Sequence, residues 1–128
     1  MDEIPTSDCA PVGLVFLDVN GLKAVNDSSG HLEGDHLIKQ AALVLKIVFG
    51  RNDIFRVGGD EFVVILKKTS EAIINQYIDA LHKESERANV SFAAGYAIAD
   101  NPADIERIFK EADFNMYQDK REHYKKKP

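Results

Sequence analysis

Three carboxylic acids stand where a metal ion could bind. Asp18 lies near the end of an apolar run, and Asp60 and Glu61 follow a pair of glycines. If their segments are neighbours in a sheet, the like charges repel one another unless a cation lies between them. Carboxylates without a nearby His or Cys cluster favour Mg²⁺, which also binds substrate phosphates. This interpretation requires a divalent ion and a nucleoside triphosphate. In the alternative, Asp18 caps a polar loop and the other two are ordinary turn acids.

The segments that must position these acids begin with a β-prone run at Val12–Val19. Its apolar residues do not alternate strictly, which is typical of a strand buried on both faces. The polar residues 20–34 predict one short helical turn followed by a loop. Apolar residues at helical spacing then predict a helix of about four turns from Leu37 to Gly50.

The second half of the chain predicts a hairpin, a helix, a strand and a final helix. Residues 53–57 and 61–66 are β-prone runs around a Gly-Gly pair, a tight-turn signal. Helical spacing follows residue 70 up to about Arg87, and large and small residues alternate over 90–98 as in a strand. An amphipathic helix begins near residue 105. A hairpin between helices predicts an α+β fold with a mixed sheet.

Several segments resemble one known family. Residues 58–62 read Gly-Gly-Asp-Glu-Phe, the signature of the GGDEF family of diguanylate cyclases, letter for letter. Residues 18–27 (DVNGLKAVND) resemble the family segment D-x-D-x-F-K-x-x-N-D. Gly30-His31 with Gly34-Asp35 resembles the G-H-x-x-G-D that follows it. Residues 112–120 resemble the closing pattern A-D-x-A-L-Y-x-A-K. The resemblance covers residues 12–120 in the family's order.

The resemblance implies a single GGDEF domain over residues 1–128, of which 121–128 form a basic tail. The implied fold is palm-like, similar to adenylate cyclases and ferredoxin-like proteins, with a mixed sheet of about five strands and helices packed over it. The implied reaction condenses two GTP into cyclic di-GMP and two pyrophosphates within a two-fold homodimer. Mg²⁺, or Mn²⁺ in its place, would assist the attack of a ribose hydroxyl on an α-phosphate.

By the same resemblance, the metal ligands are Asp18, the Val19 carbonyl, Asp60 and Glu61. Asp60 and Glu61 are also the implied catalytic residues, and the sequence leaves open which of them accepts the hydroxyl proton. Paired carboxylates around a cation commonly titrate as a unit.

The implied substrate contacts fall into two groups. Asn26 and Asp35 match the family's guanine-binding amide and carboxylate, and a carboxylate can accept the two N–H groups that adenine lacks. Without the resemblance, Asn26 caps a loop and Asp35 caps a helix. His31 is either a third substrate contact or a residue that orders the loop. The phosphate-binding positions are Gly21, Leu22, Lys23 and Lys120, and the alternative for Lys120 is a solvated basic run.

Composition narrows the remaining choices. The 128 residues suit one domain, and a net charge of −5 disfavours a protein that binds nucleic-acid phosphates, a polymerase palm included. Neither a membrane-spanning run nor a secretion signal is visible, so we expect a cytoplasmic domain without membrane contact. Cys9 is the only cysteine, which excludes an internal disulfide. We expect an upstream sensor domain in the parent protein.

The sequence departs from the family pattern in four places, and two of them, the missing N-terminal segment and the altered close after Lys120, favour a second interpretation. Residues 1–11 lack the family's D-x-L-T-G-L-x-N-R segment, and Asn20-Gly21-Leu22 replaces an acid and an aromatic residue. Arg121 stands where many members have glycine before an arginine. Gly50 occupies the arginine position of the R-x-x-D inhibitory site, so we expect no such site. The second interpretation is a catalytically weak or inactive GTP-binding module with a regulatory or dimerising role.

Overall fold

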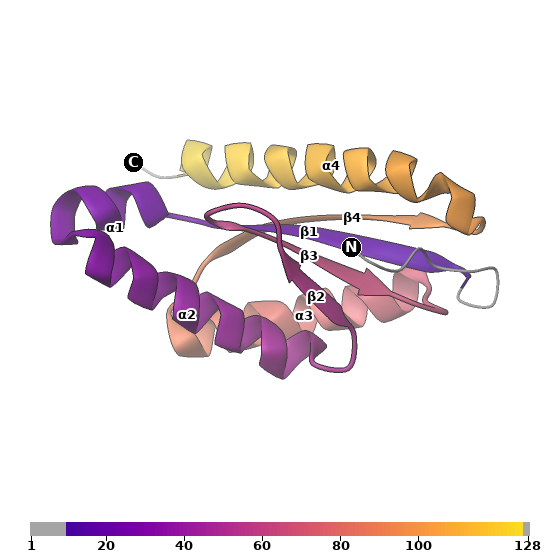
Figure 1. Ribbon diagram of the computed structural model, residues 1–128, viewed down its shortest axis with the longest axis horizontal. Helices are drawn as coiled ribbons and strands as arrows, with labels where there is room; N and C mark the ends of the chain where they lie inside the picture. Colours follow the sequence, from indigo (N-terminus) through magenta and orange to yellow (C-terminus); the bar gives the residue numbers. More distant parts are fainter. Residues whose placement is uncertain (1–9, 127–128) are drawn as a thin grey trace.

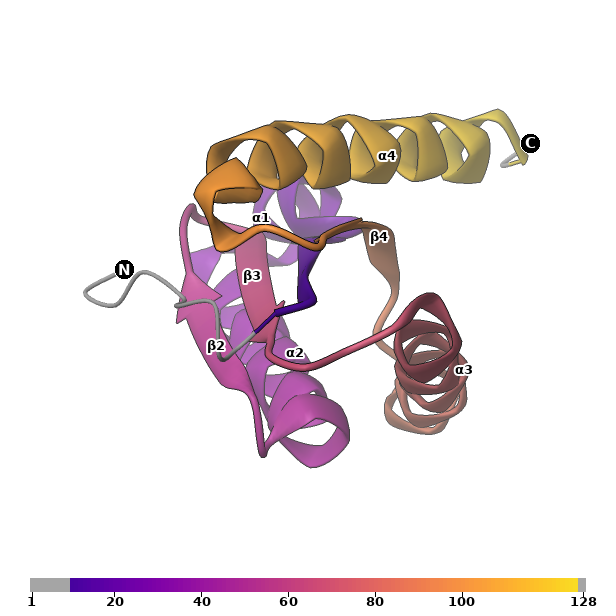
Figure 2. The ribbon, with the colours of Figure 1, turned by 90° about the vertical axis from the view of Figure 1, so that its right-hand side faces the viewer.

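The central strand of the protein is β1 (Val12–Val19), as its apolar run predicts. The structure is a computed structural model that describes residues 10–126, with side chains as far as His123. All eight residues of β1 are buried, and helices lie over both faces of the sheet (Figures 1 and 2). Cys9 and most of the segment that lacks the family's N-terminal motif lie outside the described residues.

The sheet has four strands in the order β2-β3-β1-β4, and every neighbouring pair is antiparallel. The other strands are β2 (Asp53–Arg56), β3 (Glu61–Leu66) and β4 (Phe92–Ala99). The α+β class and the hairpin are confirmed. The predicted mixed sheet of about five strands is wrong, because residues 10–126 hold four strands and no parallel pair.

The sheet is antiparallel throughout because each helical crossover joins two strands that have another strand between them. β1 and β2 run in the same direction, but β3 lies between them; β3 and β4 also share a direction, and β1 separates them. Each crossover therefore skips one place, which an antiparallel strand fills, as in split βαβ units. Periodicity along the chain reveals the crossovers but not the strand that is inserted between their ends.

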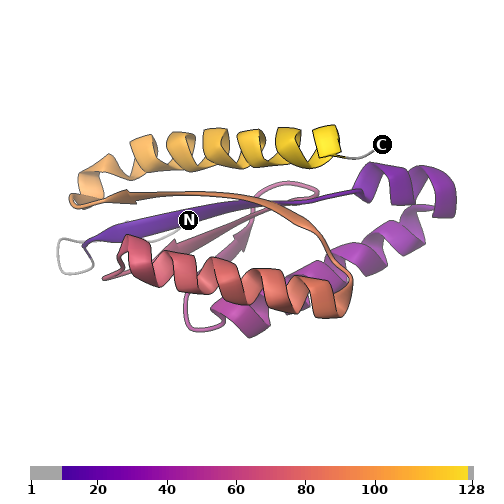
Figure 3. The same cartoon turned by 180° about the vertical axis from the view of Figure 1, so that it is seen from behind.

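The helices form two layers. α2 (His31–Phe49) and α3 (Glu71–Ala88) cover one face, and α4 (Ile105–Lys126) covers the other (Figures 2 and 3). β1 contributes Val15, Leu17 and Val19 to the first layer and alternate residues, Leu14 and Phe16, to the second. The strand is uniformly apolar because both of its faces are covered.

The segment predicted as a turn and loop over residues 20–34 is largely helical. α1 (Leu22–Ser29) is followed at once by α2, and only Gly30, with φ +89°, separates them. Gly30 donates from its N–H to the Asn26 carbonyl, and the Gly34 N–H donates to the Gly30 carbonyl. Asp35 therefore lies inside α2, and its alternative role as a helix N-cap is wrong. The polar residues of this segment give no helical periodicity, because these helices are stabilised by packing against each other.

α3 and β4 occur where periodicity predicts them. The N-cap of α3 is Ser70, whose Oγ accepts from the Ile73 N–H at 3.2 Å. In β4, large residues such as Tyr96 face α2 and α3, whereas Ala93 and Ala97 face α4.

α4 lies directly on the small residues of β4. After a short 3₁₀ turn, η2 (Pro102–Asp104), the helix runs to Lys126 and so includes residues 121–126 of the predicted basic tail. At Gly95 the backbone of α4 approaches so closely that an added Cβ would collide with the Met116 nitrogen and the Ala112 oxygen. The glycine is needed for this contact.

We predict that Gly95→Ala lowers the free energy of unfolding by about 1–3 kcal/mol, because backbone atoms cannot move aside as side chains can. Urea unfolding measures the change. Gly59→Ala is the matched control, since a Cβ at Gly59 meets nothing within 4 Å. Equal stability of the two variants would contradict the close approach of α4.

Candidate active site

The acidic residues meet at the end of the β1–β3 pair. Asp18 is the register partner of Glu61, and the Val19 N–H donates to the Asp60 carbonyl at 2.8 Å. Directly paired residues project from the same face of an antiparallel pair. Because Asp18 follows Phe16 in the alternation along β1, Asp18 and Glu61 project from the face that α4 covers. The strand and the hairpin are thus neighbours, as the metal-site interpretation requires.

Asp18 is a buried carboxyl group whose two oxygens have different surroundings. The residue is 6% exposed, and its Oδ2 lies 3.1 Å from the Lys120 Nζ on α4. Its Oδ1 is buried without a hydrogen-bond donor. Burial raises the pKa of Asp18 to about 6; the hydrogen bond from Lys120 opposes this rise, and the charge of Asp60 adds to it. A cation beside Oδ1 would replace the missing partner.

Asp60 and Glu61 differ in where their carboxylates lie. Asp60 is close enough to Asp18 for charge and hydrogen bonding to raise the Asp18 pKa. Glu61 folds over the hairpin, because its Oε1 is 2.7 Å from the position of a Cβ on Gly58. Within residues 10–126 no three acidic or imidazole side chains form a ready-made metal site. The structure therefore brings Asp18 and Asp60 together and leaves the Glu61 carboxylate turned toward Gly58.

These groups fit a magnesium ion. Mg²⁺ needs only one or two protein carboxylates, because water and substrate phosphates complete its octahedron. Asp18 and Asp60 supply two carboxylates, whose oxygens are the hard ligands that Mg²⁺ prefers. The Val19 carbonyl lies at the same end of β1. The buried Oδ1 of Asp18, which lacks a donor, is the observation that supports the fit.

Arg56, which the sequence analysis did not identify, holds the tip of the hairpin. Its Nε donates to the Gly58 carbonyl at 3.2 Å and its Nη2 to the Gly59 carbonyl at 2.6 Å. Since the Gly59 carbonyl belongs to the peptide that joins Gly59 to Asp60, Arg56 restrains the backbone that carries the acid. The available signal was a cation placed just before two glycines, whose carbonyls a tight turn leaves without strand partners.

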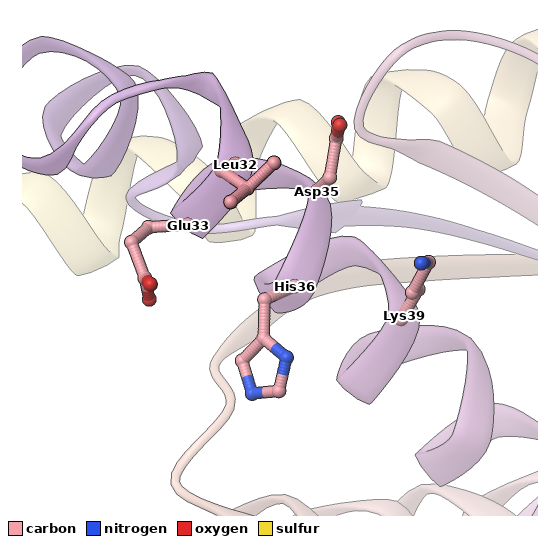
Figure 4. Close-up of a pocket in the computed structure, with 5 residues that line it drawn as sticks. All are labelled: Leu32, Glu33, Asp35, His36 and Lys39. Atoms are coloured by element: carbon pink, nitrogen blue, oxygen red, sulfur yellow. The ribbon is translucent and has the colours of Figure 1, made fainter.

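The two guanine-binding candidates come from adjacent helices. Asn26 on α1 packs so closely against Gly34 on α2 that any Cβ there would collide with its side chain. Asp35 follows Gly34 and lines a cavity of about 360 Å³ together with Leu32, Glu33, His36 and Lys39. In Figure 4 the Asp35 carboxylate points away from Glu33 and His36. Asp35 is exposed.

The phosphate-binding candidates surround the start of α1. Gly21 has φ +85°, and its carbonyl accepts the first helical hydrogen bond, from the Val25 N–H at 3.0 Å. The backbone N–H groups of Leu22 and Lys23 come before this first helical hydrogen bond, so they have no partner within the helix. The side chain of Lys23 is exposed, as is that of His31 at the first position of α2. Lys120 reaches the same end of β1 through Asp18.

The fold and the site define an α+β palm-like domain with an acidic pair at the end of its central strands. A family model described as "Diguanylate cyclase, GGDEF domain" matches residues 3–126. The chain belongs to the GGDEF family.

One curated relative and two solved structures illustrate the similarity in sequence and in fold. The chain is 32% identical over 115 residues to diguanylate cyclase DgcS of Shewanella oneidensis, covering 85% of this chain and 39% of that protein. The GGDEF domain of DgcB from Caulobacter crescentus, solved with c-di-GMP, superposes with a TM-score of 0.77 at 24% identity, over 86% of this chain and 72% of that one. An active GGEEF domain from Vibrio cholerae has the same score and identity, with coverage of 88% and 78%.

This chain spans less than half the length of the curated relative DgcS. None of the helices in residues 10–126 is both long and apolar enough to cross a membrane.

The Asp18 environment predicts a pH dependence of stability. Its folded pKa of about 6 lies above the ordinary value of 3.8, so the folded chain binds more protons than the unfolded chain between these values. The stabilisation from this group is complete below pH about 4 and is lost as the pH rises through about 6. We expect Asp18→Asn to remove this fall, measured as the wild-type-minus-variant difference in urea unfolding from pH 4 to 7.

Carboxyl NMR provides a direct check of the same group. Lys120→Met should raise the Asp18 pKa further, because a favourable charge and hydrogen bond are lost. Lys110→Met on the exposed side of α4 is the control. A wild-type Asp18 that titrates near its ordinary value would contradict the burial described above.

Proposed function

We propose that this chain is the catalytic domain of a diguanylate cyclase that condenses two GTP into cyclic di-GMP with Mg²⁺, or Mn²⁺ in its place. Each ribose 3′-hydroxyl attacks the α-phosphorus of the other GTP; two P–O bonds form, two pyrophosphates leave, and each hydroxyl gives up one proton. The observation that carries the proposal is the buried Asp18, with an oxygen that lacks a donor, beside Asp60. Family membership identifies the nucleotide chemistry that such a site would serve.

The acidic residues would hold the metal and take the proton. Asp18, Asp60, Glu61 and the Val19 carbonyl form the proposed ligand set, in which Glu61 must turn away from Gly58 to take part. When bound, the ion would lower the hydroxyl pKa and offset the charge that develops on the phosphate. Asp60, in the turn before β3, or Glu61, the first residue of β3, accepts the proton.

The start of α1 and the lysines would hold the triphosphate. The N–H groups of Gly21, Leu22 and Lys23 present partial positive charge at a helix N-terminus, which suits phosphate oxygens. Lys120 contacts Asp18, so its ammonium lies beside the proposed metal site. A cation bound at Asp18 would release the Lys120 ammonium from Asp18, so that Lys120 could bind the phosphates. The lysine thus balances the acid before substrate arrives.

The helix pair α1–α2 would select the base. In this proposal Asn26 and Asp35 meet one edge of a purine, with His31 as a further contact; supporting it, Asn26 packs on Gly34, the residue before Asp35, and His31 begins the same helix. The Asp35 carboxylate accepts from N1–H and N2–H of guanine, whereas adenine has no such donor pair. Against ATP a base-covered Asp35 would remain without a partner, which disfavours ATP.

The reaction sets the proposed partners and location. The product has two-fold symmetry, so two copies of this domain would each present one GTP to the other in a homodimer. The proposed location is the cytoplasm, where GTP is available as substrate. The greater length of DgcS leaves room in a parent protein for a sensor segment that controls this domain. The net charge of −5 gives no basis for binding nucleic acid.

We expect the purified chain, at high concentration with GTP and Mg²⁺, to form cyclic di-GMP and pyrophosphate. The double variant Asp60→Ala, Glu61→Ala should reduce kcat by about a thousandfold or more, because several kcal/mol of charge stabilisation are lost. Asp100→Ala is the control, since Asp100 follows β4 at the opposite end of β1. Calorimetric GTP binding without pyrophosphate release would instead identify a non-catalytic module. Unchanged turnover in the double variant would remove both acids from the mechanism.

Base selection is tested by Asp35→Ser. We expect the ratio of kcat/KM for GTP over ATP to fall roughly tenfold to a hundredfold, because the paired acceptors for guanine are lost. Glu33→Ser is the matched control: Glu33 is an acid in the same cavity whose side chain points away from Asp35 (Figure 4). A GTP preference retained in the Asp35 variant would contradict the assignment.

A further inference from the structure

Two polar side chains of α4 hydrogen-bond to the edge strand of the sheet. β4 is an edge strand, so alternate backbone groups along its outer side have no strand partner. The Ala94 N–H donates to the Asp119 Oδ2 at 2.9 Å, and the Asn115 Nδ2 donates to the Tyr96 carbonyl at 3.1 Å. Asn115 and Asp119 are four residues apart and so occupy neighbouring turns on one side of the helix. Together they attach the helix to two points of one strand.

Both positions differ from the family pattern quoted in the sequence analysis. In A-D-x-A-L-Y-x-A-K, the residues that correspond to Asn115 and Asp119 are both alanine, which has no side-chain hydrogen-bonding group. Alanine is also the better helix former, so the substitution is not explained by helix propensity. The contacts of both polar side chains with β4 provide a reason for their presence.

The same part of α4 has little apolar packing. Ile108, Ala112 and Met116 form the buried stripe of the helix, and Met116 is its last buried apolar residue up to His123. Lys120 is the next position on that stripe, at the same four-residue spacing, and it lies over Asp18. The hydrogen bonds of Asn115 and Asp119 therefore lie in the two turns of the helix that lead up to Lys120.

We propose that Asn115 and Asp119 are positioning residues for Lys120. Their bonds to β4 hold the last described turns of α4 in one register on the sheet, so that the Lys120 ammonium meets Asp18 and, once nucleotide binds, the phosphates. The phosphate part rests on the proposed function. A lysine side chain has four rotatable bonds, so ordering it on a phosphate costs conformational entropy. Holding its Cα in place lowers this cost and so strengthens binding.

A double-mutant cycle tests this inference. The affinity of the full chain for a non-hydrolysable GTP analogue with Mg²⁺ is measured by calorimetry for wild type, Asn115→Ala/Asp119→Ala, Lys120→Met and the combined variant. We expect the Asn115/Asp119 change to weaken binding roughly tenfold when Lys120 is present and not at all when it is absent. Gln118→Ala, an exposed residue of the same helix, should have no effect. Equal losses in both backgrounds, or no loss, would overturn the inference.

Asp119→Asn separates position from charge. The asparagine keeps an oxygen that can accept from the Ala94 N–H, so we expect it to bind the analogue like wild type. If it instead matches Asp119→Ala, the effect comes from the charge of Asp119, and the positioning role is refuted. A new tendency to self-associate, without coupling to Lys120, would show that the two residues only block the sheet edge, which also refutes it.

A readout without nucleotide separates this inference from the proposed function. The ¹⁵Nζ resonance of Lys120 reports its contact with Asp18, and it should shift in Asn115→Ala/Asp119→Ala but not in Gln118→Ala. If wild type fails to bind the analogue, the proposed function fails, and this resonance alone decides whether the two residues position Lys120. An unshifted resonance refutes the positioning role.

Discussion

The site depends on one electrostatic constraint, the burial of a carboxyl group at the end of an otherwise apolar central strand. Asp18 continues the side of β1 that faces α4, and strands cover it on both sides, Glu61 in β3 and Ala93 in β4 being its register partners. Taking such a group out of water is costly unless positive charge compensates. Lys120 compensates one oxygen of the carboxyl group, and the other oxygen is buried without a hydrogen-bond donor.

The topology explains why the acids can converge although Asp18 and Asp60 are 42 positions apart in the sequence. β3 is inserted between β1 and β2, which run in the same direction, so the turn before β3 lies beside the end of β1. The hydrogen bond from Val19 to the Asp60 carbonyl closes this junction. Arg56 then holds the two glycine carbonyls of the turn. Backbone pairing brings the carboxylates near each other, and the repulsion that results is a consequence of the strand order.

Much of this arrangement could be predicted from the sequence, and the exceptions have physical causes. The buried strand, the hairpin and the amphipathic helices follow from periodicity and turn residues. The closeness of Asp18 and Asp60 is only a condition of the metal-site interpretation, because a hairpin pairs β2 with β3 and does not by itself place β3 beside β1. The α1–α2 pair could not be recognised, because residues 22–36 carry few apolar residues and Asn26 packs on Gly34 through a contact between helices. The all-antiparallel order could not be recognised either, since strand insertion leaves no periodic signal. Arg56 and the turned Glu61 depend on local turn geometry that residue types do not reveal.

The small residues of β4 connect the packing of α4 to the acidic end of the central strand, because Gly95 pairs with Phe16 and Ala93 with Asp18. Gly95 lets the backbone of the helix lie directly on the strand, at a distance that no larger residue would allow. Close packing of this kind transmits position, because neither partner can shift without a clash or a void. The buried stripe Ile108, Ala112 and Met116 therefore directs the next turn of α4 toward Asp18, and Lys120 meets the carboxylate there. The position of the Lys120 ammonium at the site thus depends on the close packing of α4 that Gly95 allows.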